Sequence, residues 1–137
     1  MAAVKRTGGG PRADRGEAGL APADYQRLAE FRYLLRRFLV FSEQAAEQAG
    51  LTAQQHQALL TIKGHRGAQP MNTGALAERL AIRPPSAVGL IDRLVEKGYV
   101  RRQTAAADRR QVLIDLTRAG EAQLRSLTVA HRDEIKE

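Results

Sequence analysis

The sequence predicts a mainly α-helical fold with one small β-hairpin, and three observations favour it. Apolar residues recur at helical spacing through most of residues 21–137. Two of the predicted helices are separated only by residues 81–83, which is the spacing of a helix-turn-helix. Two short runs rich in β-branched residues flank the polar residues 107–110, as in a hairpin. A chain of 137 residues can bury one compact core, so we expect a single functional unit.

The chain opens with a segment that has little to bury. Residues 1–20 contain Lys5, Arg6, three consecutive glycines and Pro11, and we expect them to form a disordered N-terminal arm. A long helix begins at Pro22, because a proline in the first turn lacks only an N–H that would have no helical partner there. This helix is expected to end near Gly50.

The long helix is apolar on two sides. Its aromatic and aliphatic residues form two stripes, one of Tyr25, Leu28, Leu35 and Leu39 and one of Phe31, Leu34, Phe38 and Phe41. Such a helix is either deeply buried in its own domain or shared with a partner chain, and a small domain offers little depth. We therefore favour packing in a homodimer together with the last helix. The predicted dimerisation residues are Phe31, Leu34, Leu35, Phe38, Leu124 and Leu127.

The next three helices have recognisable ends. Thr52 and Gln55 form a capping box for a helix that Gly64 ends. Thr73 is expected to cap a short third helix, and a fourth helix runs over residues 84–98. The third and fourth helices form the helix-turn-helix.

A hairpin and a last helix complete the chain. The strands are expected over residues 99–104 and 111–116, and Thr117 caps the helix that follows. Residues 51–116 are therefore expected to form a winged helix-turn-helix, with the hairpin as its wing. Residues 21–50 and 117–137 form a helical dimerisation region.

The fourth helix has two distinct sides on a helical wheel. The side expected to face the core holds Ala87, Val88, Ile91, Leu94 and Val95. The opposite side holds Ser86, Gly89, Arg93 and Lys97, flanked by Pro85 and Leu90. Because this side is slim near its N-terminus and cationic further along, it suits close approach to a groove of duplex DNA. A merely solvated face is the alternative, since Asp92 and Glu96 could pair with nearby cations.

Arginines gather on the predicted hairpin, namely Arg101, Arg102, Arg109 and Arg110, with Asp108 near the tip. An arginine-tipped turn suits the narrow, electronegative minor groove. For Arg101 and Arg102 the alternative is a charge that protects a strand edge. Asp108 is expected to orient a neighbouring arginine by a charge-assisted hydrogen bond. The basic arm of residues 1–20 is either a passive tail or a segment that embraces the DNA.

These considerations give a set of predicted DNA-binding residues. Pro85, Ser86 and Arg93 are expected to contact bases in the major groove, where Gly89 allows close approach. The wing would contribute Arg109 and Arg110. The residues expected to contact phosphates are Arg83, Lys97 and Arg101.

The same residues resemble the MarR-type winged-helix regulators. The resemblance rests on Leu76-Ala77-Glu78-Arg79-Leu80, Ile82, Ser86-Ala87-Val88, the run from Leu90 to Arg102, Asp108-Arg109-Arg110, and Val112 to Gly120. It implies a homodimer whose fourth helices enter major grooves and whose wings reach minor grooves, on half-sites about one helical turn apart. It further implies a ligand-responsive repressor on a pseudo-palindromic operator, with an effector bound between the dimer helices and the DNA-binding lobe.

The sequence departs from the family's pattern in three places. Residues 105–107 are alanines where the family's wing usually carries an acidic residue and an arginine, which weakens the expected grip on the minor groove. Arg83 offers no conventional cap to the helix that Pro84 opens, so first-turn amides are left to water or phosphate. The chain ends at Glu137, where the family continues, which implies an abbreviated dimer interface or a truncated chain.

Composition limits the other functions. The net charge of +7 and the pI near 10.5 favour a phosphate-rich partner or an anionic membrane surface. No apolar run reaches the roughly 18 residues of a transmembrane helix, so we expect no membrane partner and a cytoplasmic protein. Cysteine is absent, which excludes disulfides and thiolate chemistry.

No enzyme, metal or cofactor is expected. His56, His65 and His131 lack close metal-ligand spacing, although His131 with Asp133 and Glu134 leaves a regulatory metal open. No glycine-rich phosphate loop and no partnered nucleophile are recognisable. Two rivals remain: a winged-helix protein-interaction module without specific DNA binding, and a small enzyme with scattered catalytic groups.

Overall fold

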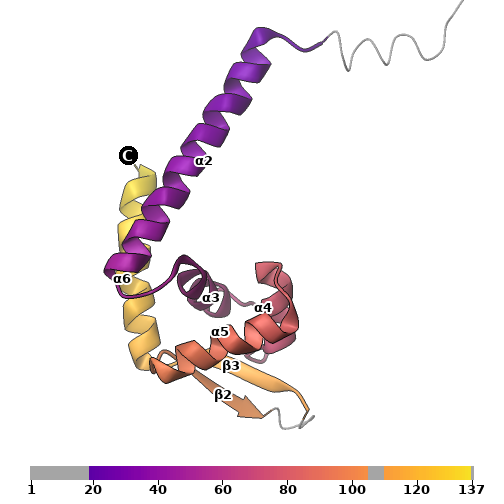
Figure 1. Cartoon of the computed structure of the whole chain (residues 1–137), viewed down its shortest axis with the longest axis vertical. Coiled ribbons are helices and arrows are strands. Elements are labelled where there is room, and N and C mark those ends of the chain that lie inside the picture. Colours follow the sequence, from indigo (N-terminus) through magenta and orange to yellow (C-terminus); the bar gives the residue numbers. More distant parts are fainter. Residues whose placement is uncertain (1–18, 105–109, 137) are drawn as a thin grey trace, which may run out of the picture. The chain divides into compact units, whose positions relative to one another are not determined.

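Five helices and three short strands make up the part of the chain that the computed structural model describes, residues 19–104 and 110–136 (Figure 1). In chain order they are α2 (Pro22–Gln48), α3 (Ala53–Lys63), β1 (Met71–Asn72), α4 (Thr73–Leu80), α5 (Pro84–Glu96), β2 (Val100–Thr104), β3 (Val112–Leu116) and α6 (Arg118–Lys136). The chain divides into two units, residues 1–40 and 41–137. Among these helices, none combines the length and apolarity needed to cross a membrane. The predicted fold class is confirmed.

The helix ends follow the local sequence. The Oγ1 of Thr52 accepts a hydrogen bond from the Gln55 amide at 3.0 Å, and the Gln55 side chain accepts one from the Thr52 amide at 3.0 Å. This capping box satisfies amides that would otherwise lack partners at the start of α3. Gly64 ends α3, and Gly98, with a φ of +80°, follows the end of α5. These predicted boundaries are confirmed.

The sheet is larger than the predicted hairpin. Its strand order is β1-β3-β2, and both pairings are antiparallel, with Val100 opposite Leu116 and Met71 opposite Ile114. β1 was not predicted. The residue that caps α4 was predicted wrongly, since the side chain of Asn72, and not that of Thr73, accepts the hydrogen bond from the Ala75 amide at 2.7 Å.

One core joins the end of α2 to the winged helix-turn-helix and to α6. Its largest fully buried side chains are Leu59, Leu76, Ile91, Leu94 and Ile114. The core also includes Ala46 of α2 and Leu124 and Leu127 of α6. Helix α5 is therefore held from behind by α4 and β2, and its remaining side is available to a partner.

Two histidines lie inside this core. The His56 and His131 rings are 4.9 Å apart, and Phe41 meets His131 edge-on at 5.2 Å. Since a carbonyl only accepts, Nδ1–H of His131 donates to the Leu127 carbonyl at 2.6 Å. In the neutral ring Nε2 of His131 accepts from the Ser42 hydroxyl at 2.8 Å. The arrangement ties the end of α2 to α6.

Stability is expected to fall as this histidine pair is acidified. Burial, and then the charge of His131, lower the pKa of His56 below its ordinary 6.5. Below about pH 6.5 the unfolded chain therefore takes up a proton that folded His56 resists, and unfolding is favoured. Above that pH both states are neutral and the full stability is present.

Urea unfolding between about pH 7.5 and about pH 5 measures this effect. His56→Gln is expected to flatten the profile in this range, whereas the same change at the exposed His65 leaves its slope intact. A profile that is equally steep in His56→Gln would contradict the assignment.

Candidate nucleic-acid interface

Helix α5 buries one face and exposes the other. Its buried residues are Ala87, Leu90, Ile91 and Leu94, at the i, i+3, i+4, i+7 spacing of a helical stripe. The wheel drawn from the sequence was therefore rotated from the true one. Val88, predicted to face the core, is 47% exposed, and Leu90, predicted to flank the outer side, is 3% exposed.

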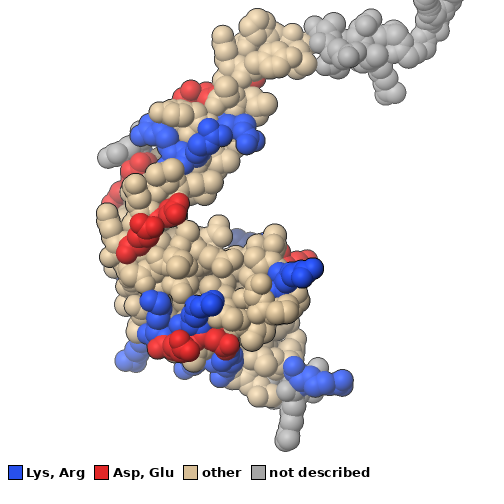
Figure 2. Space-filling model, in the orientation of Figure 1, with Lys and Arg blue, Asp and Glu red and all other residues tan. Residues whose placement is uncertain are grey.

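The N-terminal half of the exposed face carries no charge. Pro85, Ser86 and Val88 are exposed and Gly89 is half-buried, whereas the first charged residues of α5 are Asp92 and Arg93. Figure 2 shows this directly: coloured side chains gather over the C-terminal part of α5, and the surface over its N-terminal part is uncharged. The exposed face is thus slim and neutral before it becomes charged.

The start of α5 offers one amide only. Arg83 is the N-cap residue and makes no side-chain capping hydrogen bond, as predicted. Pro84 and Pro85 have no N–H, and the Ala87 amide donates to the Arg83 carbonyl at 3.1 Å. Ser86 is thus the residue whose amide and hydroxyl both lie at the exposed N-terminus of α5. The expectation that first-turn amides are left to water or phosphate therefore narrows to the amide of Ser86, because Pro84 and Pro85 have none.

The charges near the end of α5 are partly neutralised. Asp92 forms an ion pair with Arg102 of β2, which ties α5 to the wing. The ammonium of Lys97 donates to the Gly50 carbonyl at 2.9 Å. Among the described residues Arg93 makes no ion pair, so its guanidinium is the principal cation of this exposed face.

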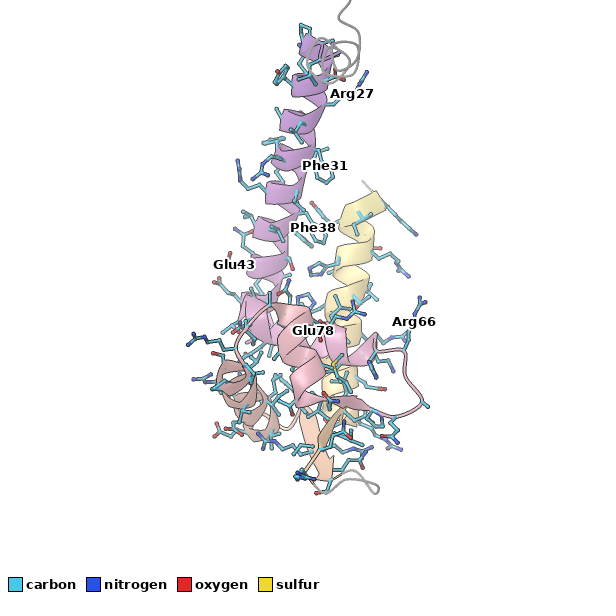
Figure 3. The ribbon with its side chains drawn as sticks, turned by 90° about the vertical axis from the view of Figure 1, so that its right-hand side faces the viewer. Arg27, Phe31, Phe38, Glu43, Arg66 and Glu78 are labelled. Carbon is cyan, nitrogen blue, oxygen red and sulfur yellow. The ribbon has the colours of Figure 1, made fainter. Side chains whose placement is uncertain are left out.

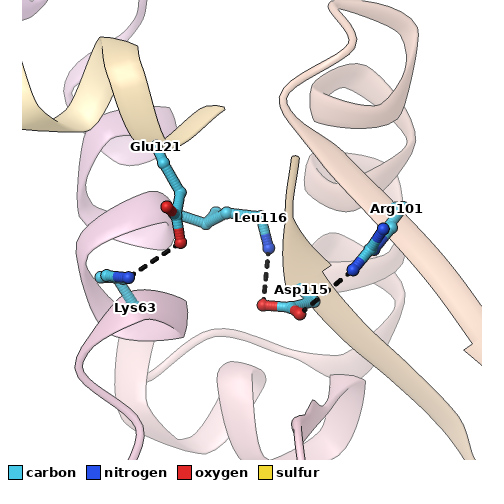
Figure 4. A network of polar contacts seen from close by, with 5 residues as sticks. All are labelled: Lys63, Arg101, Asp115, Leu116 and Glu121. Atoms are coloured by element: carbon cyan, nitrogen blue, oxygen red, sulfur yellow. Dashed lines mark hydrogen bonds and ion pairs between the residues drawn. The ribbon is translucent and has the colours of Figure 1, made fainter. Parts of the chain in front are cut away.

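The base of the wing is organised by a second ion pair. Arg101 on β2 lies opposite Asp115 on β3, with Nη2 and Oδ2 3.7 Å apart, and Asp115 also accepts from the Leu116 amide (Figure 4). Arg110 is exposed in the turn just before β3. Asp108 was predicted to orient a neighbouring arginine, and Arg109 to lie at the tip of the wing. Both lie outside the described residues.

A hollow lies where α4, α5 and the wing meet. It encloses about 390 Å³ and is lined by Asn72, Thr73, Gly74, Val88, Arg110, Gln111 and Val112. The start of α4, the exposed face of α5 and the start of β3, at the loop end of the wing, therefore converge. The sequence analysis did not predict that Thr73 and Gln111 line this hollow, since neither residue belongs to a pattern of charges.

The predicted site residues separate into three groups. Pro85, Ser86, Gly89 and Arg93 share the outward side of α5. Arg83 is exposed just before α5, and Arg110 lies at the wing. Lys97 and Arg101 are instead engaged with Gly50 and Asp115.

The predicted dimerisation residues fall into two sets. Phe31, Leu34 and Leu35 are exposed and Phe38 is half-buried, and Phe31 and Phe38 project from the same side of α2 (Figure 3). Leu124 and Leu127 are each only 4% exposed and belong to the core of the chain itself. Their prediction as dimer contacts is wrong, because α6 turns its leucine stripe toward α3.

The regulatory-metal alternative finds no support at His131. Both of its ring nitrogens are engaged, with the Leu127 carbonyl and the Ser42 hydroxyl. Within residues 19–104 and 110–136, no three His, Asp or Glu side chains converge as metal ligands would.

The arrangement defines a winged helix-turn-helix protein. Residues 49–111 match the MarR family, so the resemblance found in the sequence is confirmed for this region. The uncharacterised HTH-type transcriptional regulator ML2140 of Mycobacterium leprae is 41% identical over 61 residues. That alignment covers 44% of this chain and 41% of the relative, so the chain spans less than half of that protein's length.

Solved structures share the fold over most of the chain. A mutant of MepR from Staphylococcus aureus, bound to an oligodeoxyribonucleotide, has a TM-score of 0.68 and 25% identity, covering 82% of this chain and 78% of that one. AbsC, a MarR family transcriptional regulator from Streptomyces coelicolor, has a TM-score of 0.69 and 20% identity, covering 85% and 78%. The winged-helix fold is thus found in known MarR family proteins.

Proposed function

We propose that this chain is a cytoplasmic DNA-binding transcriptional regulator that binds a pseudo-palindromic operator as a homodimer. The observation that carries the proposal is the exposed face of α5, neutral at its N-terminal end, with Arg93 beyond it and the wing beside it. A slim helix end admits the backbone to the major groove, and a cation further along reaches a base edge or a phosphate. The net charge of +7 favours a polyanion.

The homodimer is supported by the exposed apolar residues of α2. Eight large apolar side chains between residues 25 and 40 are 44–64% exposed in the single chain: Tyr25, Leu28, Phe31, Tyr33, Leu34, Leu35, Leu39 and Val40. A contiguous apolar surface of this kind marks an interaction site. A second copy of the chain brings a second α5, which a two-fold operator requires.

A salt titration of duplex binding tests the proposal against its rival, a protein-interaction module. The logarithm of the affinity for a labelled duplex is expected to fall linearly with the logarithm of the salt concentration, by about 0.9 per phosphate neutralised. Binding that is undetectable even in dilute buffer, or that does not respond to salt, would favour the rival.

Gly89→Ala is expected to stabilise the fold and weaken duplex binding. Glycine inside a helix costs about 1 kcal/mol relative to alanine. A Cβ at this position would meet only Nη1 of Arg93, at 3.9 Å. The fold therefore gives no reason for a glycine here, whereas close approach to a groove does. Urea unfolding measures the expected gain in stability, and fluorescence anisotropy measures the expected loss of affinity for duplex DNA. An alanine variant that binds duplex as well as the parent would contradict the role of Gly89 in close approach to the groove.

We further propose that the regulator is a repressor released by a small anionic amphiphile. A hollow of about 760 Å³ lies between α3 and α6, with Leu60, Leu124 and Val129 among its apolar residues. Lys63 at its rim is paired with Glu121 at 2.8 Å, while Arg118 and Arg125 add positive charge. An apolar floor with a cationic rim fits an arene carboxylate.

A series of arene carboxylates, compared with the matching carboxamides, tests this part. The acids are expected to raise the melting temperature and weaken duplex binding, and Arg125→Gln to reduce both effects. Equal responses to acids and amides, or none to either, would contradict it. A reporter gene under the operator distinguishes repression from activation by the sign of its response.

A further inference from the structure

Val88 is exposed where the fold gains nothing from exposing it. It is the one aliphatic residue of α5 that is exposed, whereas Leu90, Ile91 and Leu94 are buried. A β-branched residue on a helix surface loses side-chain freedom and is a weaker helix former than alanine. Neither burial nor helix propensity therefore accounts for a valine at this position.

The helix neighbours of Val88 offer no free hydrogen-bonding side chain beside it, so its methyl groups are what it can present to a partner. One turn before it stands Pro85 and next to it stands Gly89, and neither has a side chain that can form hydrogen bonds. One turn after it, the carboxylate of Asp92 is occupied by Arg102. Val88 also lines the hollow in which α4, α5 and the wing meet, together with Val112, which is 37% exposed. Val88 and Val112 thus give this hollow, beside the exposed face of α5, two exposed apolar side chains.

Duplex DNA offers one apolar group in the major groove, the C5-methyl of thymine. We propose, resting on the DNA-binding function proposed above, that Val88 reads a thymine in each half-site by contact between its γ-methyl groups and that C5-methyl. Gly89 allows the helix to come close enough for this contact, and Arg93, one turn further along, contacts another position. The protein thereby selects its operator by a methyl contact at one base pair and by hydrogen bonding at another.

Replacing single thymines by uracil in a bound duplex tests the proposal, because the change removes the methyl group alone. Wild-type protein is expected to lose about fourfold in affinity at one thymine per half-site, the cost of one unburied methyl group. Replacing it in both half-sites is expected to cost about fifteenfold. Val88→Ala is expected to bind the thymine and uracil duplexes equally.

Two further variants separate recognition from structure. Val88→Thr keeps one methyl group and is expected to keep a reduced preference for thymine. Ile135→Ala truncates an aliphatic residue of α6 that is 69% exposed and lines neither the hollow at α5 nor the one between α3 and α6, and it is expected to leave the preference unchanged. The proposal is overturned if no single uracil weakens wild-type binding, or if Val88→Ala still prefers thymine at the same step. If the wild-type protein binds no duplex at all, the proposed DNA-binding function itself is contradicted.

Discussion

Gly120→Ala is expected to destabilise the chain by about 3 kcal/mol or more, because it forces a methyl group into a neighbouring backbone. Gly120 is buried in the first turn of α6, and a Cβ there would lie 2.1 Å from the Tyr99 carbonyl oxygen and 2.9 Å from its carbon. Backbone atoms cannot turn away as a side chain can. Either α6 or the strand that begins at Val100 must move.

The surrounding hydrogen bonds oppose such a movement. The Thr117 amide donates to the Tyr99 carbonyl at 3.0 Å, and its hydroxyl donates to the Gly98 carbonyl at 2.6 Å. The same hydroxyl accepts from the Gly120 amide at 3.0 Å. Displacing α6 would break this junction between α5, β2 and α6.

Urea unfolding measures the effect, with Gly89→Ala as the matched control, since the same methyl group there meets only the end of the Arg93 side chain, at an ordinary contact distance of 3.9 Å. The control is expected to be at least as stable as the parent. A Gly120→Ala protein that unfolds at the parent's urea concentration would show that the junction is looser than the structure indicates.

Arg93→Ala and Arg110→Ala are expected to weaken DNA binding in different ways. Arg93 is exposed on α5 beyond its neutral face, and we propose that its guanidinium contacts a base edge. Its loss is expected to cost about 1–3 kcal/mol of discrimination at one or two base positions if the contact is bidentate. Arg110 lies at the wing, and its loss is expected to weaken specific and random duplexes alike and to reduce the salt slope by about one.

Competition between a bound operator and its single-base variants measures the two effects. Arg125→Ala on α6 is a suitable control, because it removes the same charge from a helix outside the proposed DNA surface. Equal losses on all sequences for both Arg93→Ala and Arg110→Ala would contradict the division of roles between α5 and the wing.

The helix ends were predictable because their signals are local. The capping box of Thr52 and Gln55 and the glycine after α5 act within one turn of backbone. The two-residue strand β1 was not predictable, since it exists only by pairing with β3, some forty residues later. The cap at Asn72 follows from that pairing, which sets where α4 begins.

The rotation of α5 was harder to predict for a physical reason. Val88 and Leu90 stand on opposite sides of a helix that is apolar over most of its surface, so the sequence alone places either one inside. Contacts with α4 and β2 bury Leu90 and expose Val88. In the same way, Leu124 and Leu127 look like a dimer stripe until α3 is seen to cover them.

The sequence predicted which residues share the candidate site better than it predicted the hydrogen-bond and ion-pair partners of those residues. Pro85, Ser86, Gly89 and Arg93 share one side as expected. The bond of Lys97 to Gly50 joins residues 47 positions apart, and no local pattern indicates it. The ion pair of Asp92 was foreseen as a possibility, and Arg102 proves to be the partner.

The central claim is that two copies of α5 and its wing are presented together to duplex DNA. Selecting bound duplexes from a random pool tests it most directly. We expect enriched sequences with two-fold symmetry and half-site centres about 10 base pairs apart, or a multiple of that spacing. A pool that shows no enrichment, or enrichment for a single unrepeated site, would contradict the claim.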